Sequence, residues 1–162
     1  MSLTETCIVV GKLLVFAGLI SSAASDLARR IIPNWLVLTV GGGGVIFRLA
    51  TANWHGMLAS VGAAGIVFVA LRLLSGFGAF GGGDVKLIAA VTLGEPVLAM
   101  MPILLGIGVA GGVIALFYLV RERLWPRDEG QTGDIPRRRL EMPYAPAILA
   151  GVVWQEFWDL MT

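Results

Sequence analysis

Three long stretches of the sequence contain no Asp, Glu, Lys or Arg, namely residues 31–47, 49–71 and 96–120. A helix needs about 20 apolar residues to cross a hydrocarbon core about 30 Å thick, so each stretch is long enough, or nearly long enough, to span a membrane. The composition agrees, because only 14% of the residues are charged, against about a quarter in soluble domains. The sequence therefore predicts an all-α integral membrane protein.

Apolar segments divide the chain into about six predicted transmembrane helices, within a single membrane-embedded domain over residues 1–162. The segments are 7–25, 34–52, 56–74, 84–99, 101–120 and 143–161. Lys12 lies inside the first segment and must face other helices or extend to the membrane surface. Glu95 and Pro96 mark the far end of the fourth segment, where a hairpin turn is expected to join it to the fifth. The glycines at 41–44 are expected only to allow close helix packing.

The basic residues predict how the chain is oriented in the membrane. Arg29 and Arg30 lie in the first loop, Arg72 and Lys86 flank the third, and the polar stretch 121–141 is rich in arginine. The positive-inside rule places these three loops in the cytoplasm and both termini outside. We therefore expect 121–141 to be a cytoplasmic loop near the lipid headgroups. Its arginines are expected to determine topology rather than to bind nucleic acid.

Two acids lie at the predicted membrane boundary. Asp26 ends the first segment and Asp84 opens the fourth, and the predicted topology places both at the cytoplasmic boundary. An acid at membrane depth costs about 3 kcal/mol, which makes it a candidate functional residue. Two carboxylates at close range cannot both ionise, so the pair can activate a water for attack on a peptide carbonyl and protonate the leaving amine. Taken alone, each aspartate also fits a helix cap or a solvated boundary residue.

Other catalytic groups compete poorly with this acid pair. Cys7 has no histidine near it in the sequence, and the single histidine, His55, is predicted on the outer side. Two aspartates without nearby histidines or thiolates form a weak ligand set for a metal. No metal and no cofactor are therefore expected.

Three glycines, Gly81, Gly82 and Gly83, directly precede Asp84. Without side chains they allow unusual backbone angles and the close approach of an extended substrate strand. Lys86 follows two residues after Asp84. It either helps to balance the charge of the site or extends to a lipid phosphate, and the sequence favours neither.

Two functions other than proteolysis fit the same residues. Intramembrane acids and glycine-broken helices are common in small proton-coupled transporters. Against this, the two acids lie at one membrane face, and Lys12 is the single further candidate for a charge relay. The third hypothesis is a non-catalytic assembly subunit, in which the acids pair with arginines of a partner.

Three motifs, taken together, resemble a known family. The first is Asp26 followed by the run Ile32-Pro33-Asn34, the second is GGGDVK from Gly81 to Lys86, and the third is MPYAPAI from Met142 to Ile148. In this order they resemble the D-x(n)-IPN, GxGDxK and PYG motifs of the prepilin peptidases. These are type IV leader peptidases, a family of membrane aspartic proteases.

The resemblance implies that Asp26 and Asp84 are the catalytic pair. It also implies cleavage of type IV pilin-like precursors, after a short basic leader, at the cytoplasmic face of the inner membrane. A further set of motif positions is expected to bind substrate or shape the site: Pro33, Asn34, Gly81, Gly82, Gly83, Lys86, Pro143 and Tyr144. From their chemistry alone, Pro33 starts a helix, Pro143 interrupts the loop and Tyr144 anchors at the membrane interface.

The chain departs from the family pattern in two respects. Longer members carry a cytoplasmic insertion with four zinc-binding cysteines and also methylate the new N-terminus, whereas this chain has one cysteine. It therefore resembles the short form found in Flp/Tad pilus systems, and methyltransferase activity is not expected. Ala145 occupies the place of the usual glycine in the third motif. Among proteases, a preflagellin peptidase or another GxGD intramembrane protease is the alternative.

Overall fold

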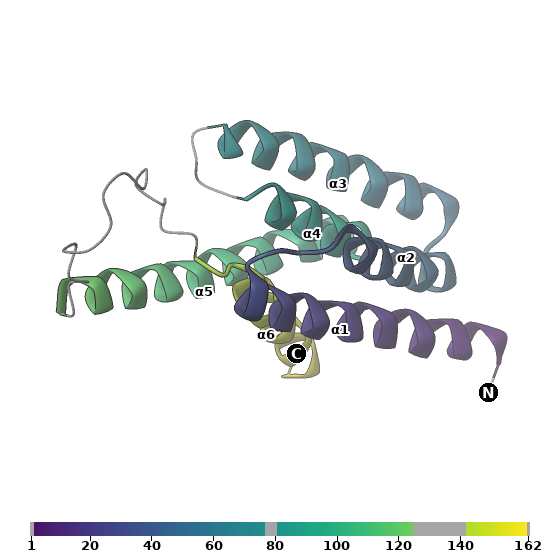
Figure 1. Cartoon of the computed structure of the whole chain (residues 1–162). Helices are drawn as coiled ribbons and strands as arrows, with labels where there is room; N and C mark the ends of the chain where they lie inside the picture. The colour runs from purple at the N-terminus through teal and green to yellow at the C-terminus, as the bar shows by residue number, and fades with distance from the viewer. Residues whose placement is uncertain (1, 77–80, 125–141, 162) are drawn as a thin grey trace.

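The computed structural model describes residues 2–76, 81–124 and 142–161, and in this part of the chain every regular element is an α-helix. The prediction of an all-α fold is confirmed. Figure 1 shows the six helices: α1 (Leu3–Arg29), α2 (Asn34–Thr51), α3 (Trp54–Ser75), α4 (Gly82–Leu93), α5 (Val97–Leu124) and α6 (Ala145–Met161). The predicted polar loop 121–141 begins later than expected, because α5 continues to Leu124. The rest of that loop lies outside the described residues.

Polar and conformationally special residues set the helix ends. At the start of α1, the Ser2 hydroxyl accepts the N–H of Glu5 at 3.2 Å, and the Glu5 carboxylate accepts the N–H of Ser2 at 2.8 Å. This reciprocal pair satisfies two N–H groups that the helix itself leaves unpaired. Helix α1 ends at Arg29, and the next residue, Arg30, has a φ of 54° in the left-handed region. Pro33 directly precedes α2, where its fixed φ suits the entry to a helix.

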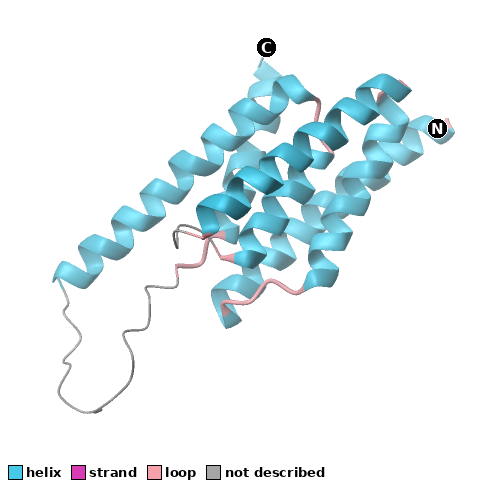
Figure 2. Cartoon of the chain, turned by 90° about the horizontal axis from the view of Figure 1, so that it is seen from above, coloured by secondary structure: helices cyan, strands magenta, loops and turns pink. Residues whose placement is uncertain are grey.

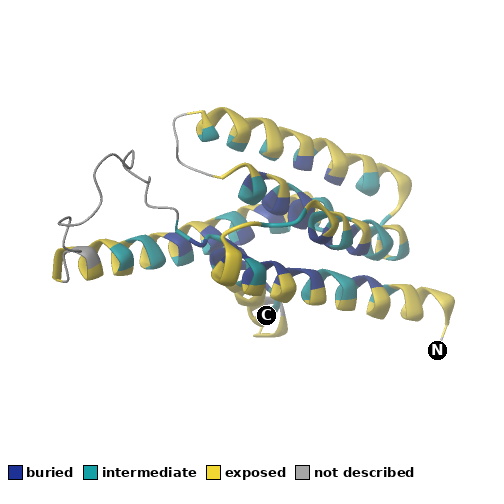
Figure 3. Cartoon of the chain, viewed as in Figure 1, coloured by how far each residue is buried: buried dark blue, intermediate teal, exposed yellow. Residues whose placement is uncertain are grey.

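The helices pack as three sequence-adjacent pairs, α1 with α2, α3 with α4 and α5 with α6, joined by the contacts of α2 with α4 and of α1 with α6. Short α4 lies in the middle, and half of its residues are buried. The inward faces form the core, whereas the outward faces are exposed (Figure 3) and largely apolar. The central core side chains are Leu19, Val40, Leu87, Ile88, Ile103 and Ile148.

Three helices, α1, α3 and α5, are long and apolar enough to cross a membrane. In α3 only 11% of the most apolar window is buried inside the protein, which leaves a broad apolar surface for lipid. Helix α4 has 12 residues and is therefore about 18 Å long, which is shorter than the hydrocarbon core. Both ends of the chain lie toward the same end of the bundle (Figure 2), as an even number of crossings requires. Six crossings and outside termini stay predictions.

The predicted fourth segment, 84–99, is wrong at its far end. Helix α4 stops at Leu93, and residues 97–99 belong to α5. Pro96 explains the break, because its ring disfavours a helical conformation at the preceding residue. The predicted turn is present, but α5 packs mainly along α6 rather than folding back on α4.

Two of the glycines at 41–44 bring helices into close contact. A Cβ atom at Gly43 would lie 2.8 Å from the carbonyl oxygen of Gly11 in α1. A Cβ atom at Gly44 would lie 2.8 Å from the Cα of Gly94, at the end of α4. At Gly42, by contrast, nothing lies within 4 Å. The packing role predicted for these glycines therefore applies to particular positions in the run.

We expect Gly44→Ala to destabilise the protein by about 1–3 kcal/mol, because the new methyl group would overlap backbone atoms that have no free rotation. Gly42→Ala is the matched control, since its methyl group enters open space and removes a flexible helix-interior glycine, which stabilises by about 0.5–1 kcal/mol. Thermal unfolding in detergent, followed by circular dichroism, compares the two. Equal unfolding temperatures would contradict the close approach of α2 and α4.

Candidate active site

Asp26 lies on the buried face of α1, one turn before its C-terminal end, with a side chain that is 6% exposed. One carboxylate oxygen, Oδ2, accepts the backbone N–H of Ala145 at 2.9 Å. Ala145 is the first residue of α6, and the first N–H groups of a helix have no partner within the helix. A carboxylate at this position is also stabilised by the positive end of the helix dipole. The first and third sequence motifs therefore meet at Asp26.

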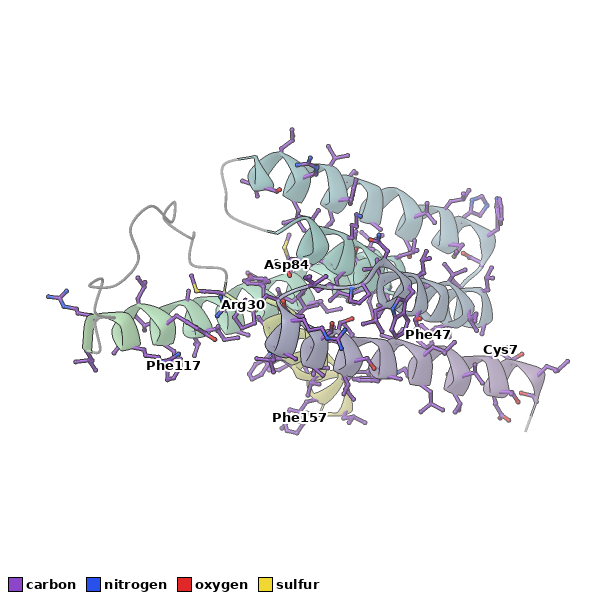
Figure 4. All side chains as sticks on the ribbon, in the orientation of Figure 1. Cys7, Arg30, Phe47, Asp84, Phe117 and Phe157 are labelled. Atoms are coloured by element: carbon purple, nitrogen blue, oxygen red, sulfur yellow. The ribbon has the colours of Figure 1, made fainter. Side chains whose placement is uncertain are left out.

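Asp84 lies in the first turn of α4 and is partly buried. Its Oδ2 atom accepts the N–H of Gly81 at 3.2 Å, which closes the start of the helix. The Asp84 carboxyl lies close enough to that of Asp26 for the two to interact electrostatically. Figure 4 shows Asp84 near the end of α1, where Arg30 is labelled. The structure thus brings together the two acids, which are 58 positions apart (84 minus 26) in the sequence.

The glycines before Asp84 act through their missing side chains and not through unusual backbone angles. Gly81 has φ −71° and ψ 150°, an extended conformation open to any residue, and Gly82 and Gly83 are helical. The unusual angles that these glycines allow are therefore not adopted. A Cβ atom at Gly81 would lie 2.9 Å from Asp84 Oδ2, and one at Gly83 would lie 3.3 Å from Ile32. A Cβ atom at Gly82 would have no atom of the described residues within 4 Å.

Lys86 and Asn34 connect α4 to the start of α2. The ammonium Nζ of Lys86 donates to Asn34 Oδ1 at 3.1 Å, and both residues are exposed. The α1–α2 loop is tied back by the Ser25 hydroxyl, which donates to the carbonyl oxygen of Ile31 at 2.8 Å. Neither reading of Lys86 from the sequence included this amide contact. The Ile32-Pro33-Asn34 motif is therefore held beside the GGGDVK motif.

Tyr144 packs inside the protein rather than only at the membrane interface. A Cβ atom at Gly111 of α5 would lie 2.5 Å from both the ring and the hydroxyl of Tyr144, so the ring rests on the backbone of that helix. Tyr144 also lies close enough to Asp84 for the two groups to interact electrostatically. Pro143 is buried next to it. All three motifs therefore surround the two carboxyls at one end of the bundle.

Sequence reasoning missed two contributors to this arrangement. The N–H of Ala145 is a backbone group, and no side-chain pattern identifies it as a partner of Asp26. Gly111 belongs to none of the three motifs, although its lack of a side chain admits the ring of Tyr144. The sequence does not distinguish Gly111 from Gly112, although in the described part of the chain a Cβ atom at Gly112 would meet nothing within 4 Å.

Comparison with known proteins gives one family and one curated relative. The model of the type IV leader peptidase family matches residues 13–116, which include Asp26 and Asp84. A prepilin leader peptidase/N-methyltransferase of Dickeya chrysanthemi is 36% identical over 88 residues. This match covers 51% of the chain and 31% of the relative, so the chain spans about a third of the relative's length. No solved structure matches the chain.

Proposed function

The chain belongs to the type IV leader peptidase family, and from this we propose that it is a membrane-embedded aspartic endopeptidase. Its proposed substrates are type IV prepilins of the Flp/Tad class, cut at the cytoplasmic face of the inner membrane. The observation that carries the proposal is the meeting of Asp26 and Asp84, two carboxyls from different helices within electrostatic reach of each other. The positive-inside rule supports the cytoplasmic face, because Arg29, Arg30 and Lys86 lie at the same end of the bundle.

In the proposed mechanism the two aspartates share one proton. The ionised partner removes a proton from water as the water attacks the scissile carbonyl, while the protonated partner donates a hydrogen bond to that carbonyl oxygen. When the intermediate collapses, the C–N bond breaks and the proton passes to the leaving amine. Each turnover consumes one water and returns the pair to its starting protonation. The buried position of Asp26 supports this role, because electrostatic interactions are stronger away from bulk water.

The start of α4 is the proposed place for the substrate backbone. A peptide bond inside a helix is shielded and already hydrogen bonded, so the substrate must be extended where it is cut. Gly81 and Gly82 are exposed, and among the described residues no atom lies within 4 Å of the place where a Cβ of Gly82 would stand. An extended segment of the substrate has room to lie there. Contacts with its backbone would give affinity without requiring particular substrate side chains. We propose cleavage without methylation, in line with the single cysteine.

The experiment that tests this function is cleavage of a Flp-type prepilin reconstituted with the protein in vesicles. Mass spectrometry of the new N-terminus reads the position of the cut. We expect one cut directly after the basic leader. An intact prepilin beside correctly inserted protein would contradict the proposal, and proton flux through the same vesicles would then favour a transporter.

The contact of Tyr144 with Gly111 gives a further prediction. Gly111→Ala adds a methyl group 2.5 Å from the ring of Tyr144, so the ring and the adjoining start of α6 must shift. We expect kcat for prepilin cleavage to fall by about tenfold or more, since displacements near 1 Å at a reacting centre cost about 10²-fold. Gly112→Ala, one residue away in open space, is expected to cleave at the wild-type rate. Equal rates for the two variants would contradict the role of this contact.

A further inference from the structure

Helices α1 and α6 are joined by polar contacts at two distant points. At the candidate active site the N–H of Ala145 donates to Asp26 Oδ2 at 2.9 Å. Toward the other end, Lys12 Nζ donates to both carboxylate oxygens of Glu156, at 2.9 and 2.8 Å. The partners are 119 and 144 positions apart in the sequence. The chain between α1 and α6 is therefore too long to determine how the two helices align.

The ion pair lies among apolar side chains within a helix able to span the membrane. Lys12 belongs to α1, one of the three candidate spans, and its ammonium lies 5.4 Å from the ring centroid of Phe47 in α2. The pair lines a small cavity together with Glu95 and apolar residues that include Val15 and Val152. The two side chains are 43% and 33% exposed, so their attraction is strong where lipid rather than water surrounds them, as it would around a membrane-spanning α1. The contact is thus suited to holding two helices in one arrangement.

The two contacts together determine how α6 is aligned on α1. They are 14 residues apart on α1 (26 minus 12) and 11 apart on α6 (156 minus 145). At a rise of about 1.5 Å per residue, these separations are about 21 and 16 Å. A slip of one residue would move α6 by about 1.5 Å and turn it by about 100°. The hydrogen bond from Ala145 to Asp26 would not survive such a slip, because it needs a short, nearly linear geometry.

We propose that Lys12 and Glu156 are positioning residues for the cleavage reaction, a role that rests on the proposed function. Their ion pair sets the register of α6 against α1 and so directs the Ala145 N–H to Asp26. Neither residue touches the substrate or the reacting atoms. Helix α6 also packs closely on α5, where a Cβ atom at Gly151 would lie 2.6 Å from the backbone nitrogen of Ile107.

Two double variants separate positioning from general stability. Lys12→Leu with Glu156→Leu removes both charges of the pair, and Glu95, the acid that lines the same cavity, stays unchanged in both double variants. We expect this variant to insert and unfold like the wild type, with kcat for prepilin cleavage reduced about 10–100-fold and KM unchanged. Lys12→Glu with Glu156→Lys restores an ion pair, and its kcat is expected within about threefold of wild type. Wild-type kcat in the leucine variant, or an equally slow charge-swapped variant, would overturn the proposal.

A second measurement reads the register directly and needs no enzyme activity. In a Cys7→Ser background, spin labels are placed on the exposed positions Ile20 of α1 and Val153 of α6. The distance distribution is expected to shift or broaden in the leucine variant and to return to its original form in the charge-swapped one. An unchanged distribution in the leucine variant overturns the inference. If the wild type cuts no prepilin, the proposed function fails, and the label distances still decide whether the pair sets the register.

Discussion

Asp84→Asn is expected to abolish prepilin cleavage while leaving the fold intact. The amide keeps the size of the side chain, and its oxygen still accepts the N–H of Gly81 that the carboxylate accepts at 3.2 Å. It loses the ability to exchange a proton, and general acid–base groups contribute about 10²–10⁴-fold to rate. The new N-terminus of the prepilin, quantified by mass spectrometry over time, gives the rate.

Asp26→Asn is expected to have the same effect, because each carboxyl depends on the other. Glu5→Gln is the matched control, since it also replaces an acid by its amide, at the far end of α1, where glutamine still completes the helix cap. Its rate should equal that of the wild type. Unfolding followed by circular dichroism confirms that all variants are folded. Wild-type cleavage by either asparagine variant would remove that aspartate from the mechanism.

Ala145→Pro is expected to reduce cleavage by about 10–100-fold. Proline has no N–H, so Asp26 loses the hydrogen bond that it accepts at 2.9 Å, and a hydrogen bond to a charged group is worth about 1.5–3 kcal/mol. The helix itself tolerates the change, because proline is favoured at the first helical position. The rate of prepilin cleavage and the unfolding temperature are measured side by side.

Ala145→Gly is the control for this substitution. Glycine keeps the N–H, and it is the usual residue at this position in the third motif of the family. Cleavage within about threefold of wild type is therefore expected. Loss of cleavage in both variants, with both folded, would show that the Ala145 side chain matters rather than its N–H. Wild-type rates in the proline variant would show that Asp26 does not need this donor.

The sequence contained enough information to predict the meeting of the two acids. Apolar segments predict the helices, and the basic loops place the ends of the first and fourth segments on one predicted side of the membrane, where Asp26 and Asp84 can meet. The structure agrees, since the two carboxyls interact electrostatically. Residue pattern is a good guide here because membrane crossing restricts the chain to few arrangements.

Details set by packing were beyond the sequence. The partner of Lys12 is Glu156, on a helix 144 positions away, and no periodicity connects them. The glycine run before Asp84 suggested unusual backbone angles, but Gly81 is simply extended. Its missing side chain is needed instead because the Asp84 carboxylate folds back onto its N–H. The end of α4 at Leu93 likewise depends on Pro96, which the sequence placed at the boundary without fixing the last helical turn.

The most direct test of the catalytic pair compares four proteins in the same vesicles: the wild type, Asp26→Asn, Asp84→Asn and the double variant. Two groups that act as one unit lose their whole contribution when either is removed. We therefore predict that the wild type alone cuts the prepilin after its leader, and that the double variant is no slower than either single one. A single variant that still cuts at the wild-type rate, or losses that multiply in the double variant, would contradict a shared catalytic pair.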